Sequence, residues 1–400
     1  MRIIYLHQYF NTPDMPGSVR SYELASKLVK SGHEVHMITL KQGSSQQLQK
    51  RFSIENGINV YWLPVKYSHK MGFLKRVISF LIFSVYAVKQ ALKINSDLIF
   101  ATSTPLTVAI PALIVKKLRG LPLVFEVRDL WPAIPIALGE IKTPLLIYLS
   151  KCLECVVYKA SKQIIALSPG MASGIHSTGI LKEKITIIPN TAELKRFSVP
   201  HQIGEKFRNK HTWIKNRPLV VYTGSLGRIN GASYLVDMAK AMRSIYPDVR
   251  FLLAGDGREK NVVISYAKRM GVYEKTMFFI PPVSKQELPT LLSAATVCMS
   301  VIIPVPELEH NSANKFFDAL AAGRPMIINY GGWQKIILEN HRAGLVLPSK
   351  DTDKAARMLA ELLNNQDKLK TMNRAALDTA RQFDLDVLAN KFLLTIESAN

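Results

Sequence analysis

Short, predominantly apolar runs alternate along the chain with longer segments in which apolar residues recur every three or four positions. The runs are rich in Val, Ile and Leu and show little of the apolar–polar alternation of a half-exposed strand. Such runs are typical of parallel strands that helices cover on both faces of a sheet. The strands expected in the first half are Ile3–Leu6, His36–Leu40, Leu98–Ala101, Leu123–Val127, Ile164–Leu167 and Ile185–Ile188.

The same pattern restarts after a polar stretch at residues 197–217. We therefore expect an α/β protein of two doubly wound domains, residues 1–196 and 197–384, whose ligands bind at the carboxyl ends of the parallel strands. Helical periodicity is clear at Ser18–Ser31, Ser233–Ile245 and Asp353–Leu363. The strands expected in the second half are Leu219–Thr223, Phe251–Ala254, Met277–Ile280, Thr296–Ser300, Met326–Asn329 and Gly344–Val346.

The charge is strongly basic, with 52 Lys and Arg against 30 Asp and Glu and a formal net charge of +22 over 400 residues. Positions 1–196 hold 25 of the basic and 11 of the acidic residues. Such a field attracts nucleic acid, an anionic membrane surface or phosphorylated small molecules. No zinc-finger, helix-turn-helix or RNP pattern is apparent, which disfavours nucleic acid. The hydrophobic content of 48% excludes wholesale disorder.

The segment Val77–Val88 is apolar but shorter than the roughly 20 residues that span a bilayer. Its all-round apolar character favours a buried core helix, while its basic flanks leave an interfacial helix on anionic lipid as the alternative. The three cysteines offer no second close ligand pair for zinc and indicate a reducing compartment. The start of the chain shows no signal-peptide pattern, so a cytosolic location is expected. His7 and His36 are expected to be structural.

Two glycine-containing loops follow neighbouring strands of the second domain, GSLGR at 224–228 and GDGR at 255–258. Glycine lets backbone N–H groups approach a phosphate, and a helix N-terminus adds partial positive charge. Either loop alone is as well explained by a structural turn, but two at one sheet edge favour a phosphate site. The donor-binding residues expected here are Gly224, Gly227, Arg228, Gly255, Asp256 and Gly257.

The segment His310–Pro325 predicts a helix with one apolar face. Asp318 lies off that face, where a carboxylate can accept both hydroxyls of a ribose. Asn314 and Lys315 precede it and can hold a diphosphate or a sugar hydroxyl. A capped core helix with a solvated aspartate is the alternative.

The run FDALAAGRP at 317–325 resembles the E-A-(L/M)-A-x-G-x-P signature of retaining GT-B glycosyltransferases of family 4. In that family two glutamates eight residues apart contact the donor sugar and the nucleotide ribose. Asp318 stands at the second position and His310 at the first, with Glu307 or Glu309 as alternatives after a loop shift. The resemblance also implies that Arg228 binds the donor phosphate, and we expect Lys315 to supply the second positive charge.

The front half carries the same resemblance. FEVRDLWP at 125–132 resembles the acceptor-side H-D segment, with Arg128 in place of His, and residues 13–20 resemble the loop that follows the first strand. The resemblance therefore implies an acceptor side with Gly17, Ser18 and Arg20. The catalytic candidates that it implies are Arg128, Asp129 and His310.

HQYFNT, FEVRDLWP and NKFFDALAAG together resemble the subgroup that builds O-antigen and capsule repeat units, which includes N-acetyl-fucosamine transferases. The resemblance implies two Rossmann-like domains that face a central cleft, with residues 385–400 forming a helix that crosses back to the first domain. It implies a hexosyltransferase that retains configuration and needs neither metal nor other cofactor. The implied donor is a UDP-linked, N-acetylated sugar, and the implied acceptor is a polyprenyl-diphosphate-linked saccharide on the inner face of the plasma membrane.

Three other functions stay open at this point. One is a UDP-sugar 2-epimerase of the same fold, which would turn over a UDP-sugar without an acceptor. The second is a non-catalytic nucleic-acid-binding protein, suggested by the basic charge. The third is a membrane-surface scaffold with a degenerate donor site, suggested by His310 at a usual Glu position. The sequence gives neither the donor sugar, the linkage nor the oligomeric state.

Overall fold

The computed structural model describes residues 1–15, 17–40, 51–67 and 71–400, which form two compact units. Unit 1 comprises Met1–Thr12, Ser18–Pro189 and Asp386–Asn400. Unit 2 comprises Asn190–Leu385 and the short segment Pro13–Gly17. The chain passes between the units at 189/190, whereas the sequence pattern places the boundary at 196/197.

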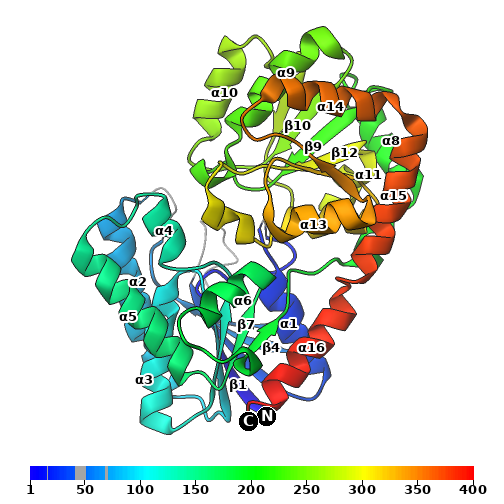
Figure 1. The fold of residues 1–400 in the computed structure, drawn as a ribbon. Coiled ribbons are helices and arrows are strands. Elements are labelled where there is room, and N and C mark those ends of the chain that lie inside the picture. Colours follow the sequence, from blue (N-terminus) through cyan, green and yellow to red (C-terminus); the bar gives the residue numbers. More distant parts are fainter. Residues whose placement is uncertain (16, 41–50, 68–70) are drawn as a thin grey trace. The chain divides into compact units, whose positions relative to one another are not determined.

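The core of unit 1 is an eight-stranded sheet in the order β3-β4-β2-β1-β5-β6-β7-β8 (Figure 1). Each strand pair is parallel except β3–β4, which is antiparallel. Every strand expected from the apolar runs is present, which confirms the parallel-sheet prediction. The strands are β1 (Arg2–Leu6), β2 (Glu34–Leu40), β3 (Phe52–Glu55), β4 (Ile58–Leu63), β5 (Leu98–Thr102), β6 (Leu123–Val127), β7 (Gln163–Ala166) and β8 (Ile185–Ile187).

The β3–β4 hairpin is absent from the sequence-based expectation. Its two-residue turn is Asn56-Gly57, with φ of 52° and 82°. An Asn-Gly pair between two apolar runs is a strong hairpin signal, because the turn needs positive φ at both residues. The edge strand β3 is half exposed, so it lacks the continuous apolar character of the buried strands.

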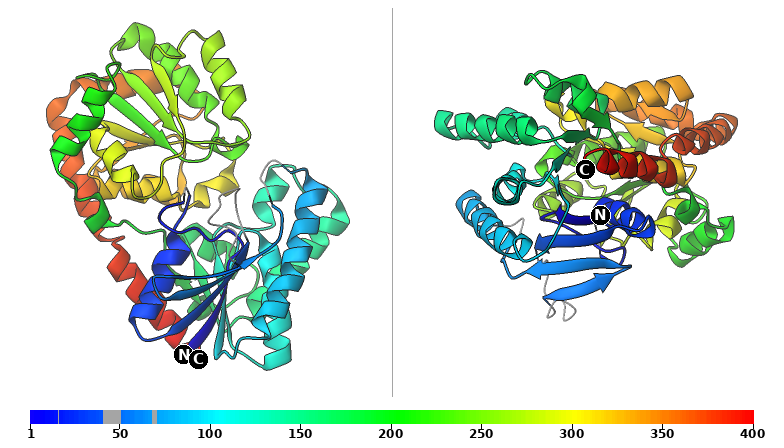
Figure 2. Two further views of the ribbon diagram at one scale, coloured as in Figure 1. Left: turned by 180° about the vertical axis from the view of Figure 1, so that it is seen from behind. Right: turned by 90° about the horizontal axis from the view of Figure 1, so that it is seen from below.

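Helices cover both faces of the unit 1 sheet. On one face α2 (Phe73–Ala91), α3 (Ala109–Arg119) and α5 (Pro144–Ala160) lie side by side (Figures 1 and 2). On the other face lie α1 (Arg20–Lys30) and α16 (Leu385–Glu397), the expected final helix. Successive residues of β5 pack on opposite faces of the sheet. Ile99 belongs to the buried cluster under α2 and α3, and the ring of Phe100 packs against Phe392 of α16. The remaining helices of unit 1 are α4 (Ala133–Ala137) and α6 (Pro169–His176).

Burial of α2 differs from the expectation. Phe83 and Ala87 are fully buried against the sheet, but Leu81 and Val85 are 51% and 68% exposed. The prediction of an all-round buried helix is therefore wrong, because the solvent-facing side of this helix is itself apolar. Among the described helices, none is long and apolar enough to cross a membrane.

Unit 2 contains a six-stranded, fully parallel sheet in the order β11-β10-β9-β12-β13-β14. The strand order reverses at β9, and in such sheets ligands bind at the carboxyl ends of the strands at this switch point. The strands are β9 (Leu219–Thr223), β10 (Arg250–Ala254), β11 (Met277–Ile280), β12 (Val297–Ser300), β13 (Met326–Ile328) and β14 (Gly344–Val346). The helices are α7 (Leu194–Phe197), α8 (His201–Lys210), α9 (Ser233–Ile245), α10 (Lys260–Arg269), α11 (Leu288–Ala294), α12 (Asn314–Ala321), α13 (Gly332–His341), α14 (Thr352–Asn364) and α15 (Gln366–Arg381).

Candidate functional site

In unit 2 the loop after β9 and the loop after β10 are in direct backbone contact. The N–H of Gly224 donates to the carbonyl of Ala254 at 3.0 Å, and that of Leu226 donates to the carbonyl of Asp256 at 2.8 Å. A Cβ at Gly255 would lie 1.9 Å from the carbonyl oxygen of Gly224. The prediction that the two loops share one sheet edge is confirmed, and loop packing itself requires glycine at 255.

The interlocked loops leave backbone donors available. Among the residues that the structure describes, the N–H groups of Ser225 and Gly227 have no hydrogen-bond acceptor. Both lie in the loop that follows β9, at the point where the strand order reverses. Gly224 takes the left-handed conformation with φ of 126°, which a glycine tolerates without strain. Such unpaired N–H groups at a sheet edge suit an anionic ligand.

Lys315, the second residue of α12, points at this loop. Its Nζ lies 3.9 Å from the centroid of the Tyr222 ring and 3.3 Å from where a Cβ of Gly224 would be. Burial lowers the pKa of Lys315 to about 7. In the described part of the chain its ammonium has no carboxylate partner. A desolvated cation of this kind favours a ligand that brings the missing negative charge.

Asp318 lies one helical turn beyond Lys315 and is 4% exposed. Its Oδ1 is 2.5 Å from Nζ of Lys285, which lies in the segment after β11. The same ammonium is 3.5 Å from Oε1 of Glu193 and lies over the ring of Phe197. Sequence reasoning missed Lys285, since no motif marks it and its partner is 33 positions away.

The remaining donor-side candidates lie around these loops. Arg228 opens a short 3-10 turn and its side chain is exposed. Asp256 is exposed and accepts from the N–H of Gly257 at 2.9 Å. Asn314 begins α12, and His310 ends the 3-10 turn Pro306–His310 with a partly exposed side chain.

Glu309, an alternative to His310, is turned toward the segment before α13. A Cβ at Gly331 would lie 2.7 Å from its Oε2, and one at Gly332 would lie 2.2 Å from its carbonyl oxygen. Gly332 also has φ of 73°. The carboxylate of Glu309 therefore lies against Gly331, where a Cβ would displace it, and the backbone of Glu309 lies against Gly332.

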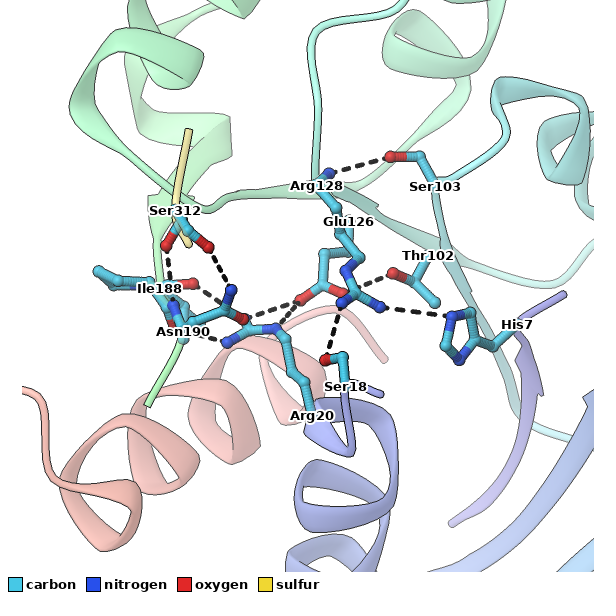
Figure 3. A network of polar contacts seen from close by, with 11 residues as sticks. His7, Ser18, Arg20, Thr102, Ser103, Glu126, Arg128, Ile188, Asn190 and Ser312 are labelled. Carbon is cyan, nitrogen blue, oxygen red and sulfur yellow. Dashed lines mark hydrogen bonds and ion pairs between the residues drawn. The ribbon is translucent and has the colours of Figure 1, made fainter. Parts of the chain in front are cut away.

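In unit 1 the side chains of Arg128, His7 and Ser18 form one polar cluster (Figure 3). Nη2 of Arg128 donates to Oγ of Ser18 at 3.1 Å, and Nη1 is 3.3 Å from Nε2 of His7. Burial and the charge of Arg128 hold the pKa of His7 well below its usual value, so the ring is neutral and Nε2 can accept. His7 is thus a buried residue that orients Arg128, in agreement with the structural role expected for it. The expected acceptor-side residue Ser18 and the catalytic candidate Arg128 thus lie together.

Asp129 follows Arg128 directly after β6. Burial raises the pKa of Asp129 to about 6, and the charge of Arg128 offsets this only in part. A carboxyl group that titrates near neutrality is suited to exchange a proton with a substrate hydroxyl.

Arg20 is 2% exposed and makes contacts with protein groups. Its Nε and Nη2 donate to Oε1 of Glu126 at 3.0 and 2.8 Å, and Nη2 also donates to the carbonyl of Ile188 at 2.8 Å (Figure 3). Nη1 donates to the carbonyl of Pro189. The guanidinium is thus hydrogen-bonded to protein groups at the end of unit 1, whereas the family resemblance implies an acceptor-side role for Arg20. Gly17 precedes α1 with φ of 122°, and Pro16 lies outside the described residues.

Asn190, which follows Pro189 in the chain, is hydrogen-bonded within unit 2. Its N–H donates to Oγ of Ser312 at 3.1 Å, and its side-chain amide donates to the carbonyl of Ser312 (Figure 3). Pro189 and Asn190 are therefore each fixed by buried hydrogen bonds, one in each unit.

Comparison with known proteins agrees with this architecture. A family model described as "Glycosyl transferase 4-like domain" matches residues 17–191, and one described as "Glycosyl transferases group 1" matches residues 217–365. WcaI of Escherichia coli, named for glycosyl transfer in colanic acid biosynthesis, is 23% identical over 76% of this chain and 77% of its own. Sucrose-phosphate synthase from Thermosynechococcus elongatus has a similar fold, with a TM-score of 0.80, 16% identity and coverage of 99% and 98%. The Anabaena protein HepE, solved with UDP and glucose, gives a TM-score of 0.76, 18% identity and full coverage of both chains.

Proposed function

We propose that this chain, which has the GT-B fold and matches two glycosyltransferase family models, transfers a hexose from a UDP-sugar to a polyprenyl-diphosphate-linked saccharide. The sugar is N-acetylated, N-acetyl-fucosamine being one example, and its anomeric configuration is retained without a metal ion. The product is a repeat unit of a bacterial O-antigen or capsule. The name of the relative WcaI, which refers to colanic acid biosynthesis, supports a role in polysaccharide synthesis.

The observation that carries the proposal is the position of Lys315 beside the loop after β9. Breaking the bond between the anomeric carbon and the diphosphate places negative charge on the leaving UDP. Groups fixed where that charge develops lower the barrier. Lys315 Nζ and the unpaired N–H groups of Ser225 and Gly227 are such groups. Arg228 of the same loop supplies a second cation.

Asp318 is the ribose-binding residue in this proposal, and Lys285 is its positioning residue. The ion pair between Asp318 and Lys285 keeps the carboxylate ionised inside the protein, where burial alone would favour its neutral form. A charged carboxylate accepts stronger hydrogen bonds from the two ribose hydroxyls than a neutral one. His310 contacts the donor sugar, at the place that a glutamate holds in the family.

The acceptor binds in unit 1. Asp129 accepts a hydrogen bond from the attacking hydroxyl, and Arg128, held by His7 and Ser18, positions the acceptor. The excess of basic residues in positions 1–196 suits an acceptor that is a lipid diphosphate in an anionic membrane. We therefore place the enzyme on the inner face of the plasma membrane, as a peripheral protein.

The test is transfer from a panel of UDP-linked hexoses to a polyprenyl-diphosphate-linked saccharide. Release of UDP is measured together with the anomeric configuration of the product by NMR. The proposal predicts acceptor-dependent UDP release, a retained configuration, and loss of both activity and UDP binding in Asp318→Ala. Asp248→Ala, an exposed position of the same unit, is the matched control and keeps both. Full turnover of the UDP-sugar without acceptor would identify an epimerase instead.

A further inference from the structure

Exposed apolar side chains are concentrated on one side of unit 1. Of the 23 large apolar residues of the described chain that are exposed, 13 lie between positions 78 and 156. Five are on α2, one directly follows it, two are on α3 and five are on α5. These residues are Ile78, Leu81, Ile82, Val85, Tyr86, Leu92, Ile114, Leu118, Leu145, Leu146, Tyr148, Leu149 and Val156, which we call the apolar face.

The three helices form one continuous layer. Helix α2 packs against α3, and α3 packs against α5. Views from two directions show them side by side over the same face of the sheet (Figure 2). Their inner sides join one buried cluster that includes Phe83, Val115 and Val157. The apolar face is thus the outer surface of the layer, over three adjacent elements of unit 1.

The charged residues of the three helices that carry the apolar face are almost all basic. The three helices carry eight basic residues and a single acidic one, Glu154. Burial raises the pKa of Glu154 to about 7, so even this group is partly neutral near physiological pH. The basic residues are Lys75, Arg76, Lys89, Lys116, Lys117, Arg119, Lys151 and Lys159.

We propose that the apolar face of α2, α3 and α5 is the surface by which the protein lies on a bilayer that contains anionic lipid. Apolar side chains on helices that lie in the interface plane enter the boundary between headgroups and acyl chains, while lysine and arginine meet the anionic headgroups. Tyr86 and Tyr148 have the amphipathic shape that favours this boundary. The biological reason for membrane binding, access to a lipid-linked acceptor, rests on the proposed function. The observations that support membrane binding do not depend on that function.

Charge complementarity selects a membrane over a second copy of this chain. A two-fold dimer through the apolar face would place the same patch against itself. The exposed lysines of the three helices would then lie close to their own copies, and Glu154 is the one acidic residue that these helices contribute on each side; these lysines are Lys75, Lys89, Lys117, Lys151 and Lys159. An anionic bilayer supplies the opposite charge and an apolar phase together.

Sedimentation with vesicles tests the proposal on the full chain. Vesicles of phosphatidylglycerol and phosphatidylethanolamine are compared with vesicles of phosphatidylcholine, at low and high salt. We expect binding to the anionic vesicles that weakens with salt. Two double variants, Leu81→Glu with Val85→Glu and Tyr148→Glu with Leu149→Glu, each lower the binding constant by at least about tenfold. The matched control is Val387→Glu with Leu394→Glu on α16, two exposed apolar positions on the opposite face of unit 1, and it binds like wild type.

A charge series completes the design. Lys117→Gln and Lys159→Gln each weaken binding about fivefold at low salt, whereas Lys30→Gln and Lys391→Gln on the opposite helices leave it unchanged. UDP stabilisation and transfer to a short-chain, water-soluble acceptor are measured on every variant. If the wild-type protein shows neither stabilisation by UDP nor transfer to this acceptor, the result counts against the proposed function alone. Failure of wild type to bind anionic vesicles, equal binding by the α2 and α5 variants, or a dimer that the same variants dissociate would each overturn the membrane assignment.

Discussion

Lys315 Nζ lies 3.9 Å from the centroid of the Tyr222 ring, and the two residues sit at the carboxyl end of the unit 2 sheet. The ring of a strand residue thus holds the amine of a helix residue against the loop after β9. Because the amine is desolvated and lacks an anionic partner in the described part of the chain, its protonation depends on what binds there.

The first prediction concerns proton uptake. With a pKa of about 7, Lys315 is mostly neutral in the free protein at pH 8.5, about 1.5 units above that value. A bound diphosphate raises the pKa, so UDP binding takes up close to one proton there and almost none at about pH 5.5. Affinity for UDP then falls as the pH rises above 7. Calorimetry in buffers of different ionisation enthalpy measures the uptake, and Lys315→Met abolishes it. Uptake that persists in this variant would assign the proton to another group.

The second prediction concerns the buried pair of Lys285 and Asp318. Lys285→Met leaves Asp318 and Glu193 without their shared cation, and breaking such a pair costs about 3–5 kcal/mol. Denaturant unfolding is expected to show this loss, together with weaker UDP binding because Lys285 no longer holds the carboxylate of Asp318 in place. Lys335→Met is the control, since Lys335 pairs with Glu339 on an exposed helix surface and contributes less than about 0.5 kcal/mol. Equal stability of the two variants would refute the role given to Lys285.

The third prediction concerns the glycine loops. Gly255→Ala forces a Cβ to 1.9 Å from the Gly224 carbonyl, so the two loops must separate. We expect a loss of at least about 1–3 kcal/mol of stability and loss of the thermal shift by UDP. Gly227→Ala is the contrast within the same loop. Its φ is −108° and the nearest atom to its new Cβ is Ser225 Oγ at 3.5 Å, so stability changes by less than about 0.5 kcal/mol. Similar effects of both substitutions would contradict the packing account.

The fourth prediction is a pH profile set by Asp129. Because burial raises its pKa to about 6, the carboxyl becomes protonated as the pH falls below that value. The account predicts that kcat/KM falls about tenfold per unit as the pH drops below 6, whereas its decline above pH 7 reflects the loss of the proton of Lys315. Asp129→Asn removes this acid limb and most of the activity, and circular dichroism checks that unit 1 stays folded. An unchanged acid limb in Asp129→Asn would place the titration elsewhere.

The sequence predicts much of the fold because buried parallel strands consist of continuous apolar runs. Strands such as Leu123–Val127 and Met277–Ile280 are found at the predicted residues. The hairpin of β3 and β4 was missed because a half-exposed edge strand lacks that signal. The burial of α2 was misjudged because periodicity shows which residues are apolar, whereas exposure depends on what covers them.

The donor loops and Lys315 were predictable because adjacent parallel strands end at the same edge. The contacts of Lys285 and Arg20 were not, because each joins residues far apart in the chain. Arg20 shows the limit most clearly. Its place in a family-like loop suggested an acceptor contact, and only its burial shows that its guanidinium holds the end of unit 1.

The central claim is that Lys315 and the loop after β9 bind the diphosphate of the donor. Isothermal titration of UDP and UMP against wild type, Lys315→Met and the exposed control Lys240→Met tests it most directly. The account predicts that wild type and Lys240→Met prefer UDP over UMP by at least about tenfold, since a charge-assisted hydrogen bond contributes about 1.5–3 kcal/mol. In Lys315→Met that preference falls by about tenfold or more while the fold is retained, and Arg228 and the backbone N–H groups of the loop account for what remains. A Lys315→Met protein that still binds UDP as tightly as wild type, with the same preference over UMP, would contradict the claim.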